Sequence, residues 1–199
     1  MPDEAGQPSP AAAPATPAAM LAAWLGDLVA MVHQRIADLT AEELAFQPDP
    51  QGNSIGVTVW HFSRWLDVIG RAFAGQPPSG ELWHSGGWAA RTGYDPTGIG
   101  HQGLGVLTGY TWAEVTKVPT LSAAELLDYL VQVTDRLLQA LDGMPTEVLH
   151  APAPGLGGTR SRYSRLSAVL QGSFGHVGEI EALKAMRARR LATKAGGVR

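Results

Sequence analysis

Apolar residues recur with the 3.6-residue period of a helix in four long segments of the chain. These segments cover residues 17–38, 54–74, 122–141 and 163–191. No stretch alternates between apolar and polar residues for long enough to predict a strand. Amphipathic helices of this length bury their apolar faces against one another, so the pattern predicts an all-α four-helix bundle.

Capping boxes support helix starts in and between these segments. In a capping box, a Ser or Thr side chain and a Glu three residues later each accept a hydrogen bond from a backbone N–H group that the helix leaves free. The pattern occurs at Ser122 with Glu125, at Thr40 with Glu43 and at Thr111 with Glu114. The last of these predicts a short additional helix in the segment TWAEVTK.

A long insertion, residues 75–120, separates the second and third predicted helices. A connection of this length in a compact domain is typical of a functional lid or a partly ordered insertion. It contains three of the six tryptophans and two of the six histidines, among many glycines. Two interpretations are open: the tryptophans line a pocket, or they form a satellite core that pins the insertion to the bundle.

Composition narrows the possible functions. A chain of 199 residues predicts one domain with a substantial core, and the absence of cysteine excludes disulfides, thiolate metal sites and a cysteine nucleophile. The net charge of −3 argues against a nucleic-acid partner. No apolar run is long enough to cross a bilayer, so no membrane association is expected and a cytoplasmic location is predicted.

The two ends of the chain differ from the middle in composition. Residues 1–16 are rich in proline and alanine and predict a disordered leader. Residues 192–199 predict a flexible basic tail, which leaves 17–191 as the folded domain. The basic residues of the last predicted helix suit a solvated helix end, where the helix dipole favours positive charge.

Two histidines are candidates for chemistry because they lie on different helices and are both predicted to face the interior of the bundle. His61 belongs to the second predicted helix and His176 to the fourth. A buried histidine needs a partner for both ring nitrogens. A metal ion is one solution, and a hydroxyl, carbonyl or carboxylate partner is another.

The stretches NSIGVTVWHFSRWLDVIGRAF and LQGSFGHVGEIEALKAM carry a resemblance to a known family. Together they resemble the DinB-like (DinB/YfiT) superfamily of putative metalloenzymes. The resemblance implies a four-helix bundle with up-down-down-up directions and a Zn or Ni ion held by three histidines. It also implies a small-molecule substrate, a low-molecular-weight thiol as a possible co-substrate, and a possible homodimer.

Carried over residue by residue, the resemblance makes His61 and His176 metal ligands, whereas the position of the third histidine is Gly172. Glu179, three residues after His176, would complete a set of two histidines and one carboxylate. His84 or His101 of the insertion are further donors. The function implied is a metal-dependent transferase, isomerase or hydrolase; the alternative is a metal-free module that binds a small molecule.

The remaining candidates are predicted to lie away from this site. Asp67 falls on the opposite side of its helix from His61 and is not expected to be a ligand. His33 lies on the polar face of the first helix, and His150 follows a short turn before a proline-rich segment, so both are predicted to be surface residues.

Overall fold

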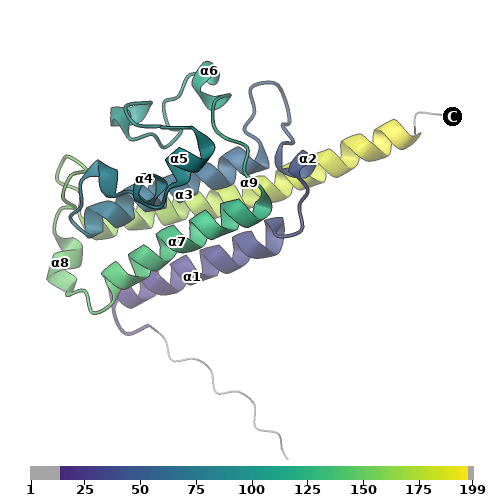
Figure 1. The fold of residues 1–199 in the computed structure, drawn as a ribbon. Coiled ribbons are helices and arrows are strands. Elements are labelled where there is room, and N and C mark those ends of the chain that lie inside the picture. Colours follow the sequence, from purple (N-terminus) through teal and green to yellow (C-terminus); the bar gives the residue numbers. More distant parts are fainter. Residues whose placement is uncertain (1–13, 197–199) are drawn as a thin grey trace, which may run out of the picture.

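The computed structural model describes residues 14–196, which form helices and no strand, so the predicted all-α class is confirmed. The long helices are α1 (Pro17–Ile36), α3 (Ile55–Phe73), α7 (Ala123–Leu141) and α9 (Arg162–Gly196), shown in Figure 1. The connections contain α2 (Ala41–Leu44), η1 (Pro78–Gly80), α4 (Leu82–Ser85), α5 (Trp88–Thr92), η2 (His101–Gly103), α6 (Trp112–Val115) and α8 (Thr146–His150). Within these residues, no helix is both long and apolar enough to cross a bilayer.

The four long helices pack as a bundle in which α1 and α3 each lie beside both α7 and α9. Helix α1 buries a stripe with the spacing of one helical face, made of Leu21, Leu25, Leu28, Val32 and Ile36. This regular stripe is the reason why the sequence pattern predicts the helix correctly. The up-down-down-up order implied by the resemblance stays a prediction.

The helix ends agree closely with the sequence signals. All three capping boxes are present, at the starts of α2, α6 and α7. Helix α1 ends at Ile36, slightly before the expected Asp38, and α9 continues to Gly196, so residues 192–196 are helical where a flexible tail was expected. Most of the predicted leader (residues 1–13) and the end of the predicted tail (197–199) lie outside the described residues.

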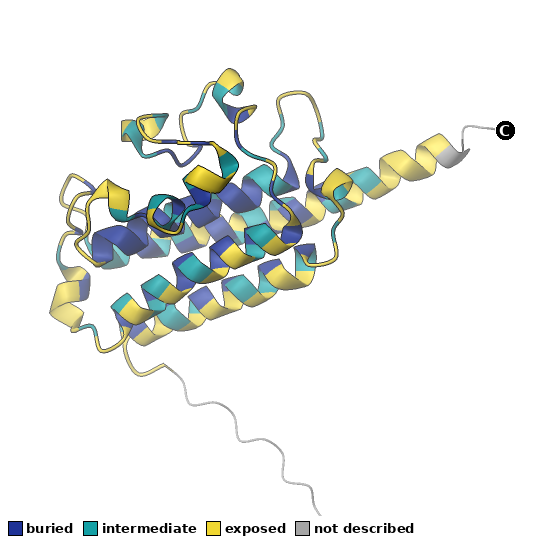
Figure 2. Ribbon diagram, in the orientation of Figure 1, coloured by how far each residue is buried: buried dark blue, intermediate teal, exposed yellow. Residues whose placement is uncertain are grey.

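Helix α3 is buried around most of its circumference, unlike α1 (Figure 2). One side packs on α7 and α9, and residues of η1 and α4 from the insertion cover another part. An amphipathic helix at the surface of a bundle would expose its polar residues to water. In α3, polar residues such as Arg64 and Asp67 are instead fully buried. This burial creates the polar network described below.

The insertion is held to the bundle by aromatic packing. Trp83 and Trp88 are buried and stack with ring centroids 6.2 Å apart. Trp83 also makes edge contacts with Trp60 of α3 at 5.7 Å and with Tyr129 of α7 at 5.2 Å. Its indole N–H donates to the Tyr94 carbonyl at 2.9 Å. For these two tryptophans, the satellite-core interpretation is the correct one.

Candidate functional site

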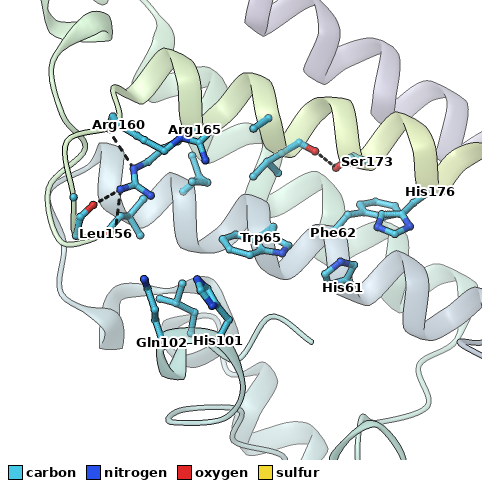
Figure 3. Close-up of a pocket in the computed structure, with 17 residues that line it drawn as sticks. His61, Phe62, Trp65, His101, Gln102, Leu156, Arg160, Arg165, Ser173 and His176 are labelled. Atoms are coloured by element: carbon cyan, nitrogen blue, oxygen red, sulfur yellow. Dashed lines mark hydrogen bonds between the residues drawn. The ribbon is translucent and has the colours of Figure 1, made fainter. Parts of the chain in front are cut away.

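His61 of α3 and His176 of α9 lie against each other, with ring centroids 5.1 Å apart and planes at 81° (Figure 3). The expected meeting of these two side chains is therefore present, but its place is not the bundle interior. Both residues are only partly buried, and the His176 side chain keeps 29% of its surface exposed. The two rings, here called the histidine pair, lie at the wall of an open pocket.

Each ring is fixed through its Nδ1 atom. Nδ1 of His61 donates a hydrogen bond to the Val106 carbonyl of the insertion. Nδ1 of His176 lies 2.7 Å from a carboxylate oxygen of Glu179, one turn further along α9. A ring that donates from Nδ1 keeps the lone pair of Nε2 when it is neutral. Both histidines therefore have an Nε2 atom that can accept a proton, bind a ligand or coordinate a metal.

The electrostatic surroundings keep His61 uncharged near neutral pH. The pKa of His61 is lowered to about 4, chiefly by burial and to a smaller extent by the nearby His176, against the opposing effect of the Val106 carbonyl. The pKa of Glu179 is lowered, chiefly by its hydrogen bond from His176, so this carboxylate is ionised at neutral pH. Glu179 thus acts as an acceptor that orients the His176 ring.

The protein donors at the histidine pair do not fit a metal site with three protein ligands. Among residues 14–196, no group of three His, Cys, Asp or Glu residues has an arrangement that would hold a metal ion. Glu179 would have to leave Nδ1 of His176 to become a ligand. His84 lies elsewhere, 3.3 Å from the Thr97 hydroxyl. The donors present are therefore two imidazoles.

A pocket of about 520 Å³ extends from the histidine pair between α3, α9, the insertion and the turn before α9. Its walls are partly apolar, and three glycines lie among the lining residues. These residues are His61, Phe62, Trp65, Ile69, His101, Gln102, Leu104, Leu156, Gly157, Gly158, Arg160, Arg165, Ala168, Val169, Gly172, Ser173 and His176. Its size is that of pockets for drug-sized molecules.

Gly172 lines this pocket and is itself exposed. A Cβ atom built there would meet no heavy atom within 4 Å, so nothing from the rest of the fold fills the space beside His176. Of the two insertion histidines considered as donors, His101 lines the pocket and His84 does not. The tryptophan in the wall is Trp65 of α3, and the insertion supplies His101, Gln102 and Leu104 rather than its tryptophans.

Sequence reasoning missed Arg160 and Arg165, which line the pocket at the end away from the histidine pair (Figure 3). A signal for Arg165 was available. It precedes His176 by eleven residues, close to three full helical turns, so the two side chains lie on one face of α9. Arg160 lies before the helix and has no such periodic signal.

A second polar cluster lies under the insertion, on the part of α3 that follows His61. Asp67 accepts from the backbone N–H groups of Leu82 and Trp83 at 2.7 and 2.8 Å and from the Tyr129 hydroxyl at 2.7 Å. Arg64 pairs with Asp67 at 3.0 Å and with Glu81 at 2.7 Å. We call Arg64, Asp67, Arg71, Glu81 and Tyr129 the buried charge network; Arg71 also pairs with Glu81, at 3.3 Å.

This network connects to the histidine pair through the insertion. Nε of Arg64 donates to the Gly105 carbonyl at 3.2 Å, and the next residue, Val106, accepts from His61. Asp67 was not expected to be a ligand at the His61 site. The structure places it in the buried charge network, where it pairs with Arg64. The i, i+3 spacing of Arg64 and Asp67 is a sequence signal for their pairing, whereas nothing in the sequence indicates that Glu81 joins them.

These features define the class of protein: an all-α four-helix bundle with an open pocket that holds the histidine pair, beside one long inserted segment. A model of the DinB superfamily matches residues 25–180, and the chain belongs to this superfamily.

One solved structure supports the fold independently. It is described as the "crystal structure of the conserved protein of locus from Enterococcus faecalis" and is similar to this chain with a TM-score of 0.69 and 22% sequence identity. The similarity covers 84% of this chain and 94% of that one. At this identity the likeness establishes the fold alone. A search of curated proteins finds no match.

Proposed function

We propose that this DinB protein binds a small molecule in the pocket between α3 and α9, without a metal ion, and that the histidine pair contacts the bound molecule through Nε2. The observation that carries the proposal is the open space at Gly172. The resemblance places a third metal-binding histidine at that position. A glycine there removes a ligand and enlarges the pocket at the same time.

The surroundings of the histidine pair suit recognition of a ligand. The Nδ1 bonds hold both rings in place, so little side-chain freedom is lost when a molecule binds. Phe62 lies nearly parallel to His176 at 6.4 Å, and Trp65 is held by a 3.3 Å hydrogen bond from its indole N–H to the Thr108 hydroxyl. Fixed aromatic walls with a few polar atoms are typical of small-molecule sites.

The test is a titration with N-phenyl-1-naphthylamine, a neutral fluorescent probe, in buffer that contains a chelator. We expect the wild-type chain to bind one equivalent of the probe and Gly172→Leu to weaken binding at least about tenfold, because the new side chain occupies the pocket. Gly178→Leu is the matched control: it lies on the same helix with open space around it and outside the pocket lining. Equal binding by wild type and Gly172→Leu would contradict the proposal.

A metal-dependent enzyme is the second candidate, and one observation favours it. Both Nδ1 atoms are bound by oxygen acceptors, the arrangement that orients metal-binding histidines in proteins. His61 and His176 would hold a Zn or Ni ion, which would supply a Lewis acid for transfer or hydrolysis. Glu179 as a third ligand, a thiol co-substrate and a homodimer stay predictions.

Metal analysis separates the two candidates. Stoichiometric zinc or nickel in protein purified from metal-supplemented cells, lost in His61→Ala, supports the enzyme. The assignment of Glu179 is tested with Glu179→Gln, which keeps an acceptor for Nδ1 of His176 but is a poor metal ligand. A metal content that Glu179→Gln leaves unchanged would identify Glu179 as an orienting residue only.

A further inference from the structure

The pocket carries positive charge at one end and no acidic residue anywhere in its lining. Its ionisable lining residues are two arginines and three histidines. Figure 3 shows Arg160 and Arg165 at one end and the histidine pair at the other. Eleven residues of helix separate Arg165 from His176, which corresponds to about 16 Å along the axis of α9.

The two arginines are held in place by uncharged acceptors only. Arg165 donates to the carbonyls of Leu156 at 3.2 Å, of Gly157, and of Arg160 at 3.4 Å. Arg160 donates to the backbone carbonyl of Ser164 at 3.2 Å and to its hydroxyl at 3.3 Å. Neither arginine forms a salt bridge within residues 14–196, in contrast to Arg64 and Arg71.

The charges at this end of the pocket are therefore not neutralised by the protein. The pKa of Arg165 is lowered, first by partial burial and then by the charge of Arg160, so the two guanidinium groups repel each other. The Nη1 atom of each arginine has no protein acceptor in the described part of the chain. Guanidinium groups bind carboxylate and phosphate groups strongly through pairs of N–H donors.

We propose that the molecule bound in the pocket is an organic anion, with its carboxylate or phosphate group at Arg160 and Arg165. Its apolar body lies along Trp65 and Val169 and extends toward the histidine pair. This inference rests on the proposed small-molecule function and adds the chemical class of the ligand. The arginine contacts also hold the turn before α9, and the experiment below separates that structural role from anion binding.

The experiment compares three probes that share one apolar body: 4-phenylbutanoate, 4-phenylbutyl phosphate and the neutral 4-phenylbutan-1-ol. Binding to the full chain is measured by isothermal titration calorimetry in the presence of a chelator. We expect at least one anion to bind about tenfold or more tightly than the alcohol, because hydrogen bonds to charged groups contribute more than neutral ones. The preferred anion distinguishes a carboxylate from a phosphate ligand, and added salt should reduce the preference.

Variants assign the effect to the two arginines. We expect Arg160→Gln and Arg165→Gln each to weaken anion binding about tenfold and to leave binding of the alcohol unchanged. Arg160→Lys and Arg165→Lys should restore part of the preference, since the charge is kept. Arg189→Gln, an exposed position on the same helix outside this pocket, is the control. Within residues 14–196, the Arg160 side chain donates hydrogen bonds to Ser164 alone, so its variant keeps the test valid if Arg165→Gln fails to fold.

The outcomes separate this inference from the proposed function. If the alcohol binds as tightly as both anions, and Gly172→Leu blocks binding of all three probes, the proposed small-molecule binding in the pocket is supported and the anion proposal is overturned. An anion preference that survives in both glutamine variants overturns it as well. If none of the three probes binds, nor N-phenyl-1-naphthylamine, the proposed function falls together with the anion site.

Discussion

Helix α3 carries two polar clusters that differ in how completely their polar atoms are satisfied. In the buried charge network, Asp67 has no exposed surface and accepts from two backbone N–H groups, a hydroxyl and a guanidinium. At the histidine pair, which joins His61, six residues before Asp67 on α3, to His176 of α9, each ring uses Nδ1 and faces an open pocket. The buried charge network is closed to solvent, whereas the histidine pair is open to the pocket.

The comparison shows that burial of charge alone does not mark a functional site. Removing one partner from a buried, hydrogen-bonded cluster leaves an uncompensated charge, so such a cluster is expected to matter for folding. An open cluster with free acceptors is stable without further partners in the protein and can exchange its water for a ligand. The following predictions test this division of roles, from the largest expected effect to the smallest.

Asp67→Ala should have the largest effect on stability. The change leaves Arg64 and two backbone N–H groups without their carboxylate, and we expect the free energy of unfolding to fall by about 3–5 kcal/mol. Urea unfolding followed by circular dichroism measures it. If the variant does not fold, Glu81→Gln gives a milder test of the same network. A loss below about 1 kcal/mol in both variants would refute the structural role of this cluster.

Gly172→His should convert the open cluster into a metal site. The new histidine lies four residues before His176 on one helix face, a spacing that places two imidazoles on one ion, and His61 supplies a third. We expect zinc affinity to rise at least about 100-fold over wild type, which corresponds to about 2.8 kcal/mol. Calorimetric titration measures the affinity, and added zinc should raise the melting temperature.

Two controls accompany this variant. Gly172→Ala should gain no metal affinity, and His61→Ala in the Gly172→His background should lose the gain. Zinc affinity equal to that of wild type in Gly172→His would show that the three positions do not converge on one ion.

His61→Ala and His176→Ala should change stability little and binding strongly. Each removes a partly buried ring and one hydrogen bond, for which we expect a cost of about 1 kcal/mol or less in the free energy of unfolding. The same variants should weaken pocket binding of N-phenyl-1-naphthylamine. A cost as large as that of Asp67→Ala would instead place the histidine pair among the structural clusters.

The capping box at the start of α7 gives the smallest effect and a baseline for an exposed polar group. Its hydrogen bonds from Ser122 lower the pKa of Glu125 below the ordinary value of 4.5. A carboxyl with a lowered folded-state pKa stabilises the protein above its unfolded pKa and loses this contribution as pH falls through the folded value. Glu125→Gln should therefore reduce the loss of stability between pH 7 and pH 3, by about 0.5 kcal/mol or less in an exposed setting.

The bundle itself was predictable because its signals are local. The buried stripe of α1 and the three capping boxes depend on residues a few positions apart, and the structure reproduces them. The meeting of His61 and His176 was also anticipated from their helical faces. Their place at a pocket wall was not anticipated. Helical periodicity assigns a direction to a side chain, but it does not tell which other segments cover that side chain.

The parts that could not be predicted depend on contacts between distant segments. The burial of Arg64 and Asp67 requires the insertion to lie on α3, which no periodicity reveals. Likewise, the arginine end of the pocket requires the turn at residues 156–158 to fold against α9. Glycines allow this turn: Gly155, Gly157 and Gly158 all have positive φ angles, where other residues are strained.

The contact of Arg64 with the Gly105 carbonyl has a consequence for motion. The segment that supplies an acceptor to His61 also accepts from the guanidinium that pairs with Asp67 and Glu81, so the segment cannot leave α3 without breaking its bonds to both His61 and Arg64. The backbone amides at Leu82, Trp83 and Leu104 to Val106 should therefore exchange with solvent as one cooperative unit. Access of water to the histidine pair from this side would then be set by the opening rate of the core.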